Sequence, residues 1–431
     1  MMHRMFVLLV FLRQLWFAGA DVGGFSHPVI LIPGIGGSQM EANLTGKPHV
    51  VNPFCLRHTT KYFDIWLNLE ELLPIAIDCF VHNMMLQTNP ENGMVSNMPG
   101  VDIRVSGFGT SAGVEFVDKS RIAPGMYFFL LVENLVKWGF RRDVSILGAP
   151  YDYRVAPEEL GEYYLRLRKL IEKAYIDALN NRVVVIGHSL GNIIALHLFT
   201  RIVDQAWKDK YIKAFVTIGA PWAGSMKALK GYTSGHNFEA PNFFLPPMKL
   251  RPGQRTYTSL ASLFPTRMAW KDDEVLATVG STNYTLADMP QFFTRLEYEM
   301  AWKQVQRLGT LDKTLPAPGV RVYCIFGVGL PTTSRLIWTN KSFPHEQPKE
   351  IRDRTGDGTV EERSADLCRH WNPGNNAGKK VTLHRIRGAN HMHTIHHPTT
   401  VEIIRQVVIS PNTAASSFSI VFLWISSWLS L

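Results

Sequence analysis

A five-residue motif limits the fold more than any other feature of the chain. Residues 187–191 read Gly-His-Ser-Leu-Gly. The apolar run at residues 182–186 predicts a buried strand before the motif, and the apolar spacing of residues 193–203 predicts a helix after it. The two glycines tolerate a tight strand-to-helix turn that projects a serine hydroxyl from the edge of a sheet. We therefore predict that Ser189 is a nucleophile rather than part of a structural turn.

The same alternation of strands and helices continues along the chain. Apolar runs predict further strands at residues 27–32, 145–150, 214–218, 320–326 and 380–384, and helical spacing predicts helices at residues 124–139 and 160–179. Strands that alternate with helices form a parallel sheet covered on both faces. With the serine turn, this pattern predicts an α/β-hydrolase fold with a mostly parallel central sheet, over residues 21–410.

A serine nucleophile needs an imidazole base, and a carboxylate must orient that base. The fold predicts the chain order serine, acid, histidine. Asp357 lies between glycines in the sequence Thr-Gly-Asp-Gly-Thr-Val, a setting that lets a carboxylate project from a turn. Asp353 and Asp366 are the alternatives. We predict Asp357 as the acid.

The base should follow the last strand, where four histidines lie. His391 is favoured by its spacing from the strand, and His393, His396 and His397 are the alternatives. The four show no regular spacing on one face, so we do not expect a metal site. The developing oxyanion needs backbone N–H donors, for which we predict Leu190 and, in the glycine-rich residues 33–37, Ile35.

Two segments are predicted to contact lipid or cover the site. The stretch between Cys55 and Cys79 contains Phe63, Trp66 and Leu67, and within a closed loop such residues cannot all reach the main core. We predict a membrane-binding insertion at about residues 48–95, with a satellite core as the alternative. Residues 231–255 carry several prolines around Phe243 and Phe244 without a clear period, which predicts a lid or an irregular cap.

Both ends of the chain carry processing signals. A basic start, an apolar run and Ala-Gly-Ala at residues 18–20 predict a signal peptide over residues 1–20. The sequons at Asn43, Asn283 and Asn340 agree with N-glycosylation in the secretory pathway. Residues 411–431 form an apolar tail that resembles a GPI-attachment signal, with a self-packed tail as the alternative. These features predict an extracellular protein, soluble or GPI-anchored.

The chain has four cysteines, an even number that predicts two disulfides in an oxidising compartment. Three connectivities are open, and sequential pairing is the simplest because it closes two local loops. The formal charge is +9 without a Lys/Arg block. A nucleic-acid partner therefore has little support, whereas an anionic membrane or a dispersed solvated surface fits this charge.

Six motifs occur in order: residues 149–154 (Ala-Pro-Tyr-Asp-Tyr-Arg), 187–191, 219–222 (Gly-Ala-Pro-Trp), 323–329 (Tyr-Cys-Ile-Phe-Gly-Val-Gly), 356–360 (Gly-Asp-Gly-Thr-Val) and Gly388-x-x-His391. With them the chain resembles the lecithin:cholesterol acyltransferase family, which includes lysosomal phospholipase A2, over residues 27–408. The chain departs from the family pattern at two positions. Ile35 stands where the sterol acyltransferase and lysosomal branches look to carry Cys or Asp, and Asn192 stands where the sterol branch has Cys.

The resemblance implies a triad of Ser189, Asp357 and His391, oxyanion donors at Ile35 and Leu190, and disulfides Cys55–Cys79 and Cys324–Cys368. The second pair looks more like the plasma sterol branch than the lysosomal one. The resemblance also implies that the Cys55–Cys79 loop lies on a membrane and that residues 231–255 form a mobile lid.

The implied reaction moves a fatty acyl chain from phosphatidylcholine-like lipids to a sterol, another lipid alcohol or water, without a metal or organic cofactor. The implied partners are a phospholipid membrane or lipoprotein surface and an activating apolipoprotein-like protein. Two alternatives remain: a lysosomal-type phospholipase A2 and ceramide transacylase located in the lysosome, and a catalytically silent lipid-binding protein.

Overall fold

The structure is a computed structural model that describes residues 26–121, 125–237, 245–371 and 374–409. The predicted signal peptide, the apolar tail and the lid residues Phe243 and Phe244 lie outside these ranges. Among the helices of the described ranges, none is long and apolar enough to span a bilayer.

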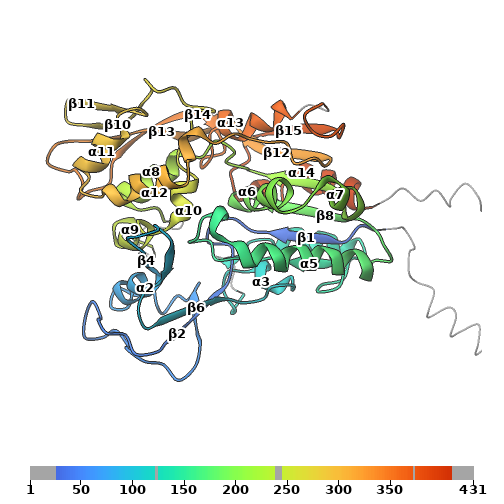
Figure 1. Cartoon of the computed structure of the whole chain (residues 1–431), viewed down its shortest axis with the longest axis horizontal. Coiled ribbons are helices and arrows are strands. Elements are labelled where there is room, and N and C mark those ends of the chain that lie inside the picture. The colour runs from blue at the N-terminus through green and yellow to red at the C-terminus, as the bar shows by residue number, and fades with distance from the viewer. Residues whose placement is uncertain (1–25, 122–124, 238–244, 372–373, 410–431) are drawn as a thin grey trace, which may run out of the picture.

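Six parallel strands form the central sheet, in the order β15-β12-β9-β8-β1-β7 (Figure 1). They are β1 (Val29–Ile32), β7 (Ile146–Gly148), β8 (Val183–His188), β9 (Ile212–Ile218), β12 (Val322–Val328) and β15 (Val381–Arg387). Each overlaps a predicted strand. Parallel strands covered on both faces read as nearly continuous apolar runs, which is why the sequence identifies them. The predicted α/β-hydrolase fold is confirmed.

Helices cover both faces of this sheet. Val29 and Leu31 of β1 share a hydrophobic cluster with α4 (Phe129–Lys137), α14 (Pro398–Val408) and the short α3 (Ala112–Glu115). Ile30 and Ile32 belong to a second cluster with α5 (Gly161–Asp177), α6 (Leu190–His197), the π-helical turn Leu198–Ile202 and α7 (Gln205–Tyr211). Successive side chains of a strand point to opposite faces, so one strand supplies both halves of the core.

A second sheet, which the sequence did not predict, lies beside the first in the order β11-β10-β13-β14. Its strands are β10 (Val275–Val279), β11 (Thr282–Thr285), β13 (Leu330–Trp338) and β14 (Lys349–Gly356). The helices of this part are α8 (Met226–Ser234), α9 (Pro247–Gln254), α10 (Thr258–Ser262), α11 (Met289–Arg295) and α12 (Glu299–Arg307). Short turns of helix are η2 (Pro157–Glu159), η4 (Thr310–Asp312), α13 (Glu362–Ala365), η5 (Asp366–His370) and η6 (His393–Ile395). The antiparallel hairpin β13–β14 ends directly before Asp357.

The segment predicted as an irregular lid contains regular structure. Its first residues complete α8, and Pro247 opens α9. Proline fits the first turn of a helix because the N–H it lacks has no intrahelical partner there. Residues 247–254 are therefore helical, although the sequence shows no clear period there.

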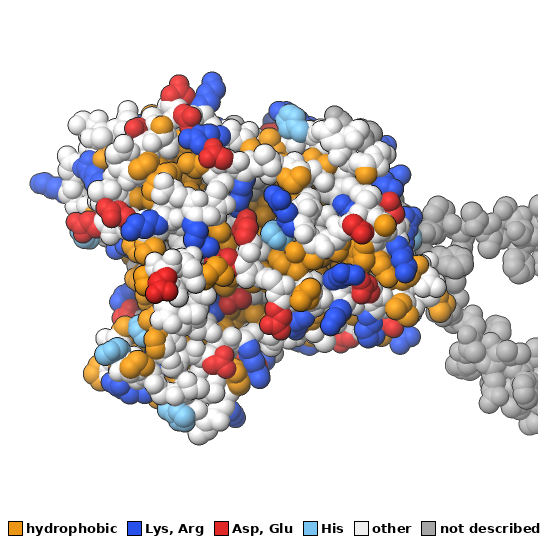
Figure 2. All heavy atoms as spheres, in the orientation of Figure 1, with side chains coloured by type: hydrophobic (Ala, Val, Ile, Leu, Met, Phe, Trp, Pro, Cys, Tyr) orange, Lys and Arg blue, Asp and Glu red, His pale blue; other side chains and the backbone are white. Residues whose placement is uncertain are grey.

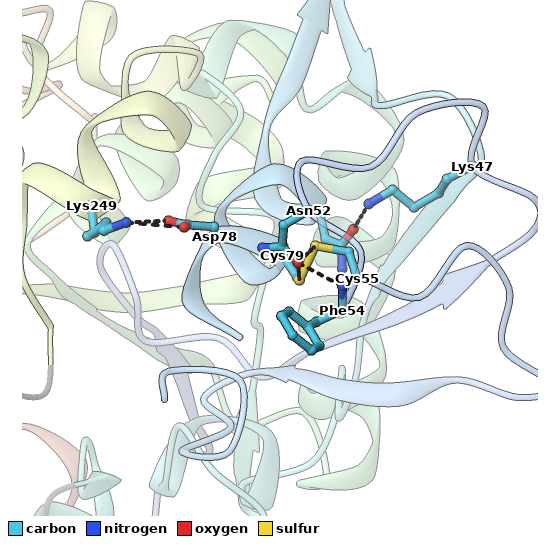
Figure 3. Close-up of a disulfide and its surroundings, with 8 residues drawn as sticks. Lys47, Asn52, Phe54, Cys55, Asp78, Cys79 and Lys249 are labelled. Carbon is cyan, nitrogen blue, oxygen red and sulfur yellow. Dashed lines mark hydrogen bonds and ion pairs between the residues drawn. A yellow bond between two sulfur atoms is a disulfide. The ribbon is translucent and has the colours of Figure 1, made fainter. Parts of the chain in front are cut away.

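The insertion folds together with the strands that flank it, and its buried side chains join the hydrophobic cluster of the hydrolase core. It contains the antiparallel sheet β3-β2-β6, made of β2 (Met40–Leu44), β3 (Phe63–Trp66) and β6 (Val101–Val105). Helix α2 (Ile77–Met84) and the hairpin of β4 (Leu86–Thr88) and β5 (Val95–Asn97) complete it. A disulfide joins Cys55 to Cys79 at the start of α2 (Figure 3), and another joins Cys324 of β12 to Cys368 of η5.

The structure corrects the assignment of Trp66 as a membrane-facing residue. Its side chain is 5% exposed, and its indole N–H donates to the carbonyl of Gly36 at 2.8 Å. Phe63 and Leu67 are half-buried and pack against the core. The large apolar side chains of the insertion that are exposed to solvent are Val51, Phe54, Leu56, Leu69, Leu73, Ile75 and Met94. In Figure 2, hydrophobic side chains are visible on the surface of the insertion, at the lower left.

Polar contacts join the insertion to the rest of the molecule, among them those of Arg154 and Lys249. The fully buried guanidinium of Arg154 pairs with Asp152 at 2.7 Å and donates to Asn97 Oδ1 at 2.7 Å and to the carbonyl of Met84 at 3.3 Å. Lys249 of α9 pairs with Asp78 of α2 at 3.0 Å (Figure 3). The hydrogen bonds of Arg154 anchor the insertion to the hydrolase core. The Lys249–Asp78 ion pair joins it to α9.

Candidate active site

Ser189 occupies a strained turn between β8 and α6. Its φ of 53° and ψ of −126° lie outside the regions that residues with a Cβ prefer. Its backbone N–H donates to the carbonyl of Ile218 at 2.9 Å, which ties the turn to β9. A Cβ on Gly191 would lie 2.2 Å from the carbonyl oxygen of Ile32, so only glycine allows this approach of helix and sheet. The local sequence thus builds the turn predicted for a nucleophile.

Asp357 and His391 form a buried pair beside this turn. His391 Nδ1 lies 2.7 Å from Asp357 Oδ2, and the two residues are 8% and 1% exposed. The other carboxylate oxygen of Asp357 accepts the N–H groups of Thr359 at 3.0 Å and Val360 at 2.8 Å. These bonds fix the carboxylate, which in turn orients the imidazole.

The alternative acids and bases lie elsewhere. Asp353 is exposed on β14, and Asp366 pairs with Arg369 and Arg385. The rings of His396 and His397 contact His393 at centroid distances of 5.1 and 5.3 Å. In the part of the chain that the structure describes, no group of three His, Cys, Asp or Glu side chains could hold a metal ion.

A series of hydrogen bonds that the sequence did not predict connects the glycine-rich loop to His391 through Tyr127 and His188. The N–H of Gly34 donates to the Tyr127 hydroxyl at 2.8 Å, and that hydroxyl lies 2.5 Å from His188 Nδ1. On its other side, His188 Nε2 lies 3.2 Å from the carbonyl of His391. Burial, and then the nearby His391, lower the pKa of His188 well below its ordinary value. A neutral His188 therefore links the glycine-rich loop to the backbone of His391.

Of the two predicted oxyanion donors, Ile35 lines the pocket of Ser189, and Leu190 follows Ser189 directly in the chain. Ile35 belongs to the turn closed by the Gly37 N–H to Gly34 carbonyl bond of 3.1 Å, and Ile35 lines the pocket with Ser189. Leu190 is the first residue of α6, where backbone N–H groups have no intrahelical acceptor. Asn192 stabilises this helix start, because its side-chain amide donates to the carbonyls of Ser189 at 3.0 Å and Ile218 at 2.9 Å.

Ser189, Asp357 and His391 all line one cavity of about 440 Å³. About half of its other lining residues have apolar or aromatic side chains, among them Ile35, Pro221, Ala228, Tyr257, Leu260, Leu263, Leu330, Pro331, Val360 and Met392. Polar and charged side chains line it as well, among them Ser225, Lys227, His236, Gln254, Arg352 and Asn390. The arrangement suits a long apolar ligand whose reacting group lies at Ser189.

Glu361, next to the Asp357 loop, gives the protein a testable pH dependence. Burial raises the pKa of Glu361 to about 8 against smaller opposing effects of backbone N–H groups and Arg363. Between the ordinary glutamate pKa and this value, the folded state holds a proton that the unfolded state has lost, so stability falls as pH rises. Glu361→Gln should therefore gain stability relative to the wild type from pH 5 to pH 8.

Unfolding of both proteins by denaturant at pH 5, 6, 7 and 8 measures this effect. Glu346→Gln, at an exposed position, is the matched control and should follow the wild type at every pH. A difference between Glu361→Gln and wild type that stays constant with pH would contradict the assignment.

Comparisons with known proteins agree with this geometry. Residues 62–398 match the family described as lecithin:cholesterol acyltransferase. The chain is 42% identical to phosphatidylcholine-sterol acyltransferase of Gallus gallus, over 85% of this chain and 87% of that one. It is 40% identical to lysosomal phospholipase A and acyltransferase of Homo sapiens, over 94% and 96%. For the phosphatidylcholine-sterol acyltransferase of Homo sapiens the identity is also 40%, over 90% and 86%.

The predicted resemblance is thus confirmed by matches that cover most of the chain and most of each relative. The chain belongs to the lecithin:cholesterol acyltransferase family.

Proposed function

We propose that this enzyme moves a fatty acyl chain from phosphatidylcholine-like phospholipids to a sterol, another lipid alcohol or water, with Ser189 as the nucleophile. The observation that carries the proposal is the buried Asp357–His391 pair, which shares a partly apolar cavity with a serine in a strained turn. Such a turn and pair are the parts that serine acyl transfer requires. The phospholipid donor is inferred from the activities for which the relatives are named.

In the first half-reaction, Ser189 Oγ attacks the ester carbonyl of the donor while His391 Nε2 takes the serine proton. Asp357, bonded to Nδ1, holds the imidazole in the required tautomer and stabilises the imidazolium. The backbone N–H groups of Ile35 and Leu190 donate to the tetrahedral oxyanion. When the ester C–O bond breaks, His391 returns the proton to the departing lysolipid oxygen, and the acyl chain remains on Ser189.

In the second half-reaction, an acceptor hydroxyl attacks the acyl-enzyme and gives its proton to His391. The new ester forms, Ser189 recovers its proton from His391, and the cycle closes. Water as acceptor gives a phospholipase, and a sterol or other lipid alcohol gives an acyltransferase. The apolar side chains in the cavity at Ser189 suit a lipid acceptor.

The surroundings of the site complete the proposal. The insertion presents exposed aliphatic and aromatic side chains that suit contact with a membrane or lipoprotein surface, and residues 231–255 act as a lid that closes over the lipid. The relatives include a lysosomal enzyme, so the chain is assigned to the secretory pathway. Within that route, we propose cleavage after residue 20, glycans on Asn43, Asn283 and Asn340, and extracellular release or a GPI anchor. We also propose that an apolipoprotein-like protein activates the enzyme.

The second candidate function is that of a lysosomal-type phospholipase A2 and ceramide transacylase. Relatives of both kinds match at similar identity: 40% for the human lysosomal enzyme and 42% for the chicken sterol acyltransferase. Both functions use the same triad and differ in the acceptor and in the pH of action.

A single assay separates them. The protein is incubated at pH 5 and pH 7.4 with phosphatidylcholine vesicles that contain both cholesterol and a short-chain ceramide, and acylated products are identified by mass spectrometry. Cholesteryl ester at pH 7.4 is the expected product. Acylceramide at pH 5 without cholesteryl ester would establish the lysosomal-type function instead, and vesicle binding without lysolipid would refute both.

A further inference from the structure

A second cavity lies at the edge of the central sheet opposite Ser189. It has a volume of about 410 Å³ and is lined by residues at the amino ends of β8, β9, β12 and β15. Ser189 follows the carboxyl end of β8, so the sheet separates the two cavities. In Figure 1 the amino ends of the strands lie to the right, away from the insertion at the lower left. The acyl-transfer reaction makes no use of this cavity.

Cations dominate its charged lining. The cavity is lined by one carboxylate, Asp209, and by five cationic side chains: Arg182, Lys208, Lys213, Arg321 and Lys379. Four of the five lie within two residues of the first residue of a strand, and Lys208 comes from α7. Because parallel strands start at the same edge, the fold gathers cations that are far apart in the sequence. We call this site the basic cavity.

Part of the basic cavity is rigidly built. Lys208 is 8% exposed, and its ammonium donates to the carbonyl of Phe199 at 3.0 Å. A Cβ on Gly319 would lie 2.8 Å from that ammonium, so glycine makes room for the lysine. Lys379 is held by Asp209 at 2.8 Å. These contacts fix two cations at defined positions.

The other three cations lack a counter-ion. Over the ranges that the structure describes, no carboxylate forms an ion pair with Arg182, Lys213 or Arg321. Burial lowers the pKa of Lys213, and the charges of Arg182 and Arg321 lower it further. The cations therefore repel one another in a partly desolvated hollow. Low-dielectric walls lined by one sign of charge focus the field and concentrate ions of the opposite sign.

We propose that the basic cavity binds a small anion that carries phosphate or sulfate groups. Two guanidinium groups can each form paired hydrogen bonds with such an oxyanion, and the lysines add compact charges. The volume is in the range of small-molecule sites. The cations surround one concave cavity rather than a stripe, which suits a soluble polyphosphate or a single lipid headgroup and not a nucleic-acid strand.

Calorimetric titration with tripolyphosphate at constant ionic strength tests the proposal. The wild type should bind with a single-site isotherm, and Arg182→Gln/Lys213→Gln/Arg321→Gln should weaken binding at least about tenfold. The matched control, Arg141→Gln/Lys169→Gln/Arg201→Gln, removes the same charge from exposed positions outside the cavity and should bind like the wild type. Lys213→Gln alone is a milder variant if the triple variant unfolds.

Recruitment to vesicles identifies the source of the anion. In a Ser189→Ala background, which prevents consumption of the lipid, phosphatidylcholine vesicles with and without phosphatidic acid are compared. Recruitment by phosphatidic acid that tripolyphosphate displaces and the triple variant loses identifies a headgroup. Tripolyphosphate binding without such recruitment identifies a soluble anion. If the wild type binds neither tripolyphosphate nor these vesicles, or if the triple variant binds as well as the wild type, the proposal is overturned.

Discussion

Ser189→Ala is expected to abolish the formation of lysolipid and of every acylated product, with a loss of about 10⁵-fold or more in kcat. The acyl-enzyme cannot form without the hydroxyl, and no other group in the cavity can replace it at the same position. Alanine is the right replacement because it keeps a Cβ at a residue whose φ is 53°. Glycine would relax the turn, and its effect on kcat would mix lost chemistry with changed backbone geometry.

The controls for this variant measure folding and lipid contact separately from chemistry. Its unfolding midpoint and its vesicle affinity should equal those of the wild type, since the Asp357–His391 pair and the insertion are untouched. Turnover is followed by mass spectrometry with both cholesterol and ceramide present, so that a switch of acceptor is not mistaken for loss of activity. A correctly folded variant that retained more than about 1% of the wild-type turnover would refute Ser189 as the nucleophile.

The central sheet could be predicted from the sequence, whereas the second sheet could not. Each strand of the parallel sheet is a short apolar run, because helices cover both of its faces. Strand β14 reads Lys-Glu-Ile-Arg-Asp-Arg-Thr-Gly, with little apolar character and no simple alternation. Its position depends on pairing with β13 rather than on its own composition. Sequence patterns therefore missed the hairpin that delivers Asp357.

The candidate site likewise has a part that the sequence predicts and a part that it does not. The turn at Ser189 is local, so glycine spacing and flanking patterns are sufficient to predict it. Asp357 and His391 needed the chain order of the fold to choose them from neighbouring acids and histidines. No sequence pattern indicated the contact between Tyr127 and His188, because 61 residues separate the two side chains, whose atoms lie 2.5 Å apart. His188 stood inside the motif itself, at a position where the motif accepts any residue.

The insertion shows why apolar composition alone does not predict which side chains are exposed for contact with a membrane. Trp66 is large and apolar, but its indole N–H has an acceptor 30 residues earlier and its ring packs against Phe80 at a centroid distance of 6.1 Å. The exposed residues are smaller or lie in turns: Phe54 and Leu56 flank Cys55 and are 71% and 63% exposed. The disulfide to Cys79 holds these turns in place, which lowers the entropy cost of presenting them to a membrane.

Phe54→Ser/Leu56→Ser is expected to weaken binding to phosphatidylcholine vesicles about 30–150-fold. Transfer of the two exposed side chains into the bilayer interface contributes about 2–3 kcal/mol at roughly 25 cal/mol per Å² of apolar area, and each 1.4 kcal/mol is a factor of ten. Vesicle turnover at low lipid concentration should fall in proportion, whereas turnover of a soluble short-chain ester should stay unchanged, because both residues lie outside the Ser189 cavity.

The matched control is Leu165→Ser/Ile176→Ser, which removes two aliphatic side chains that are 57% and 64% exposed on α5. Vesicle flotation and the two turnover assays are run on both variants at equal folded concentration. Loss of vesicle binding confined to the Phe54/Leu56 variant assigns the membrane contact to the insertion. Equal losses in the two variants would mean that lipid binds the protein through general surface hydrophobicity, and the disulfide-held turns would then have no special role.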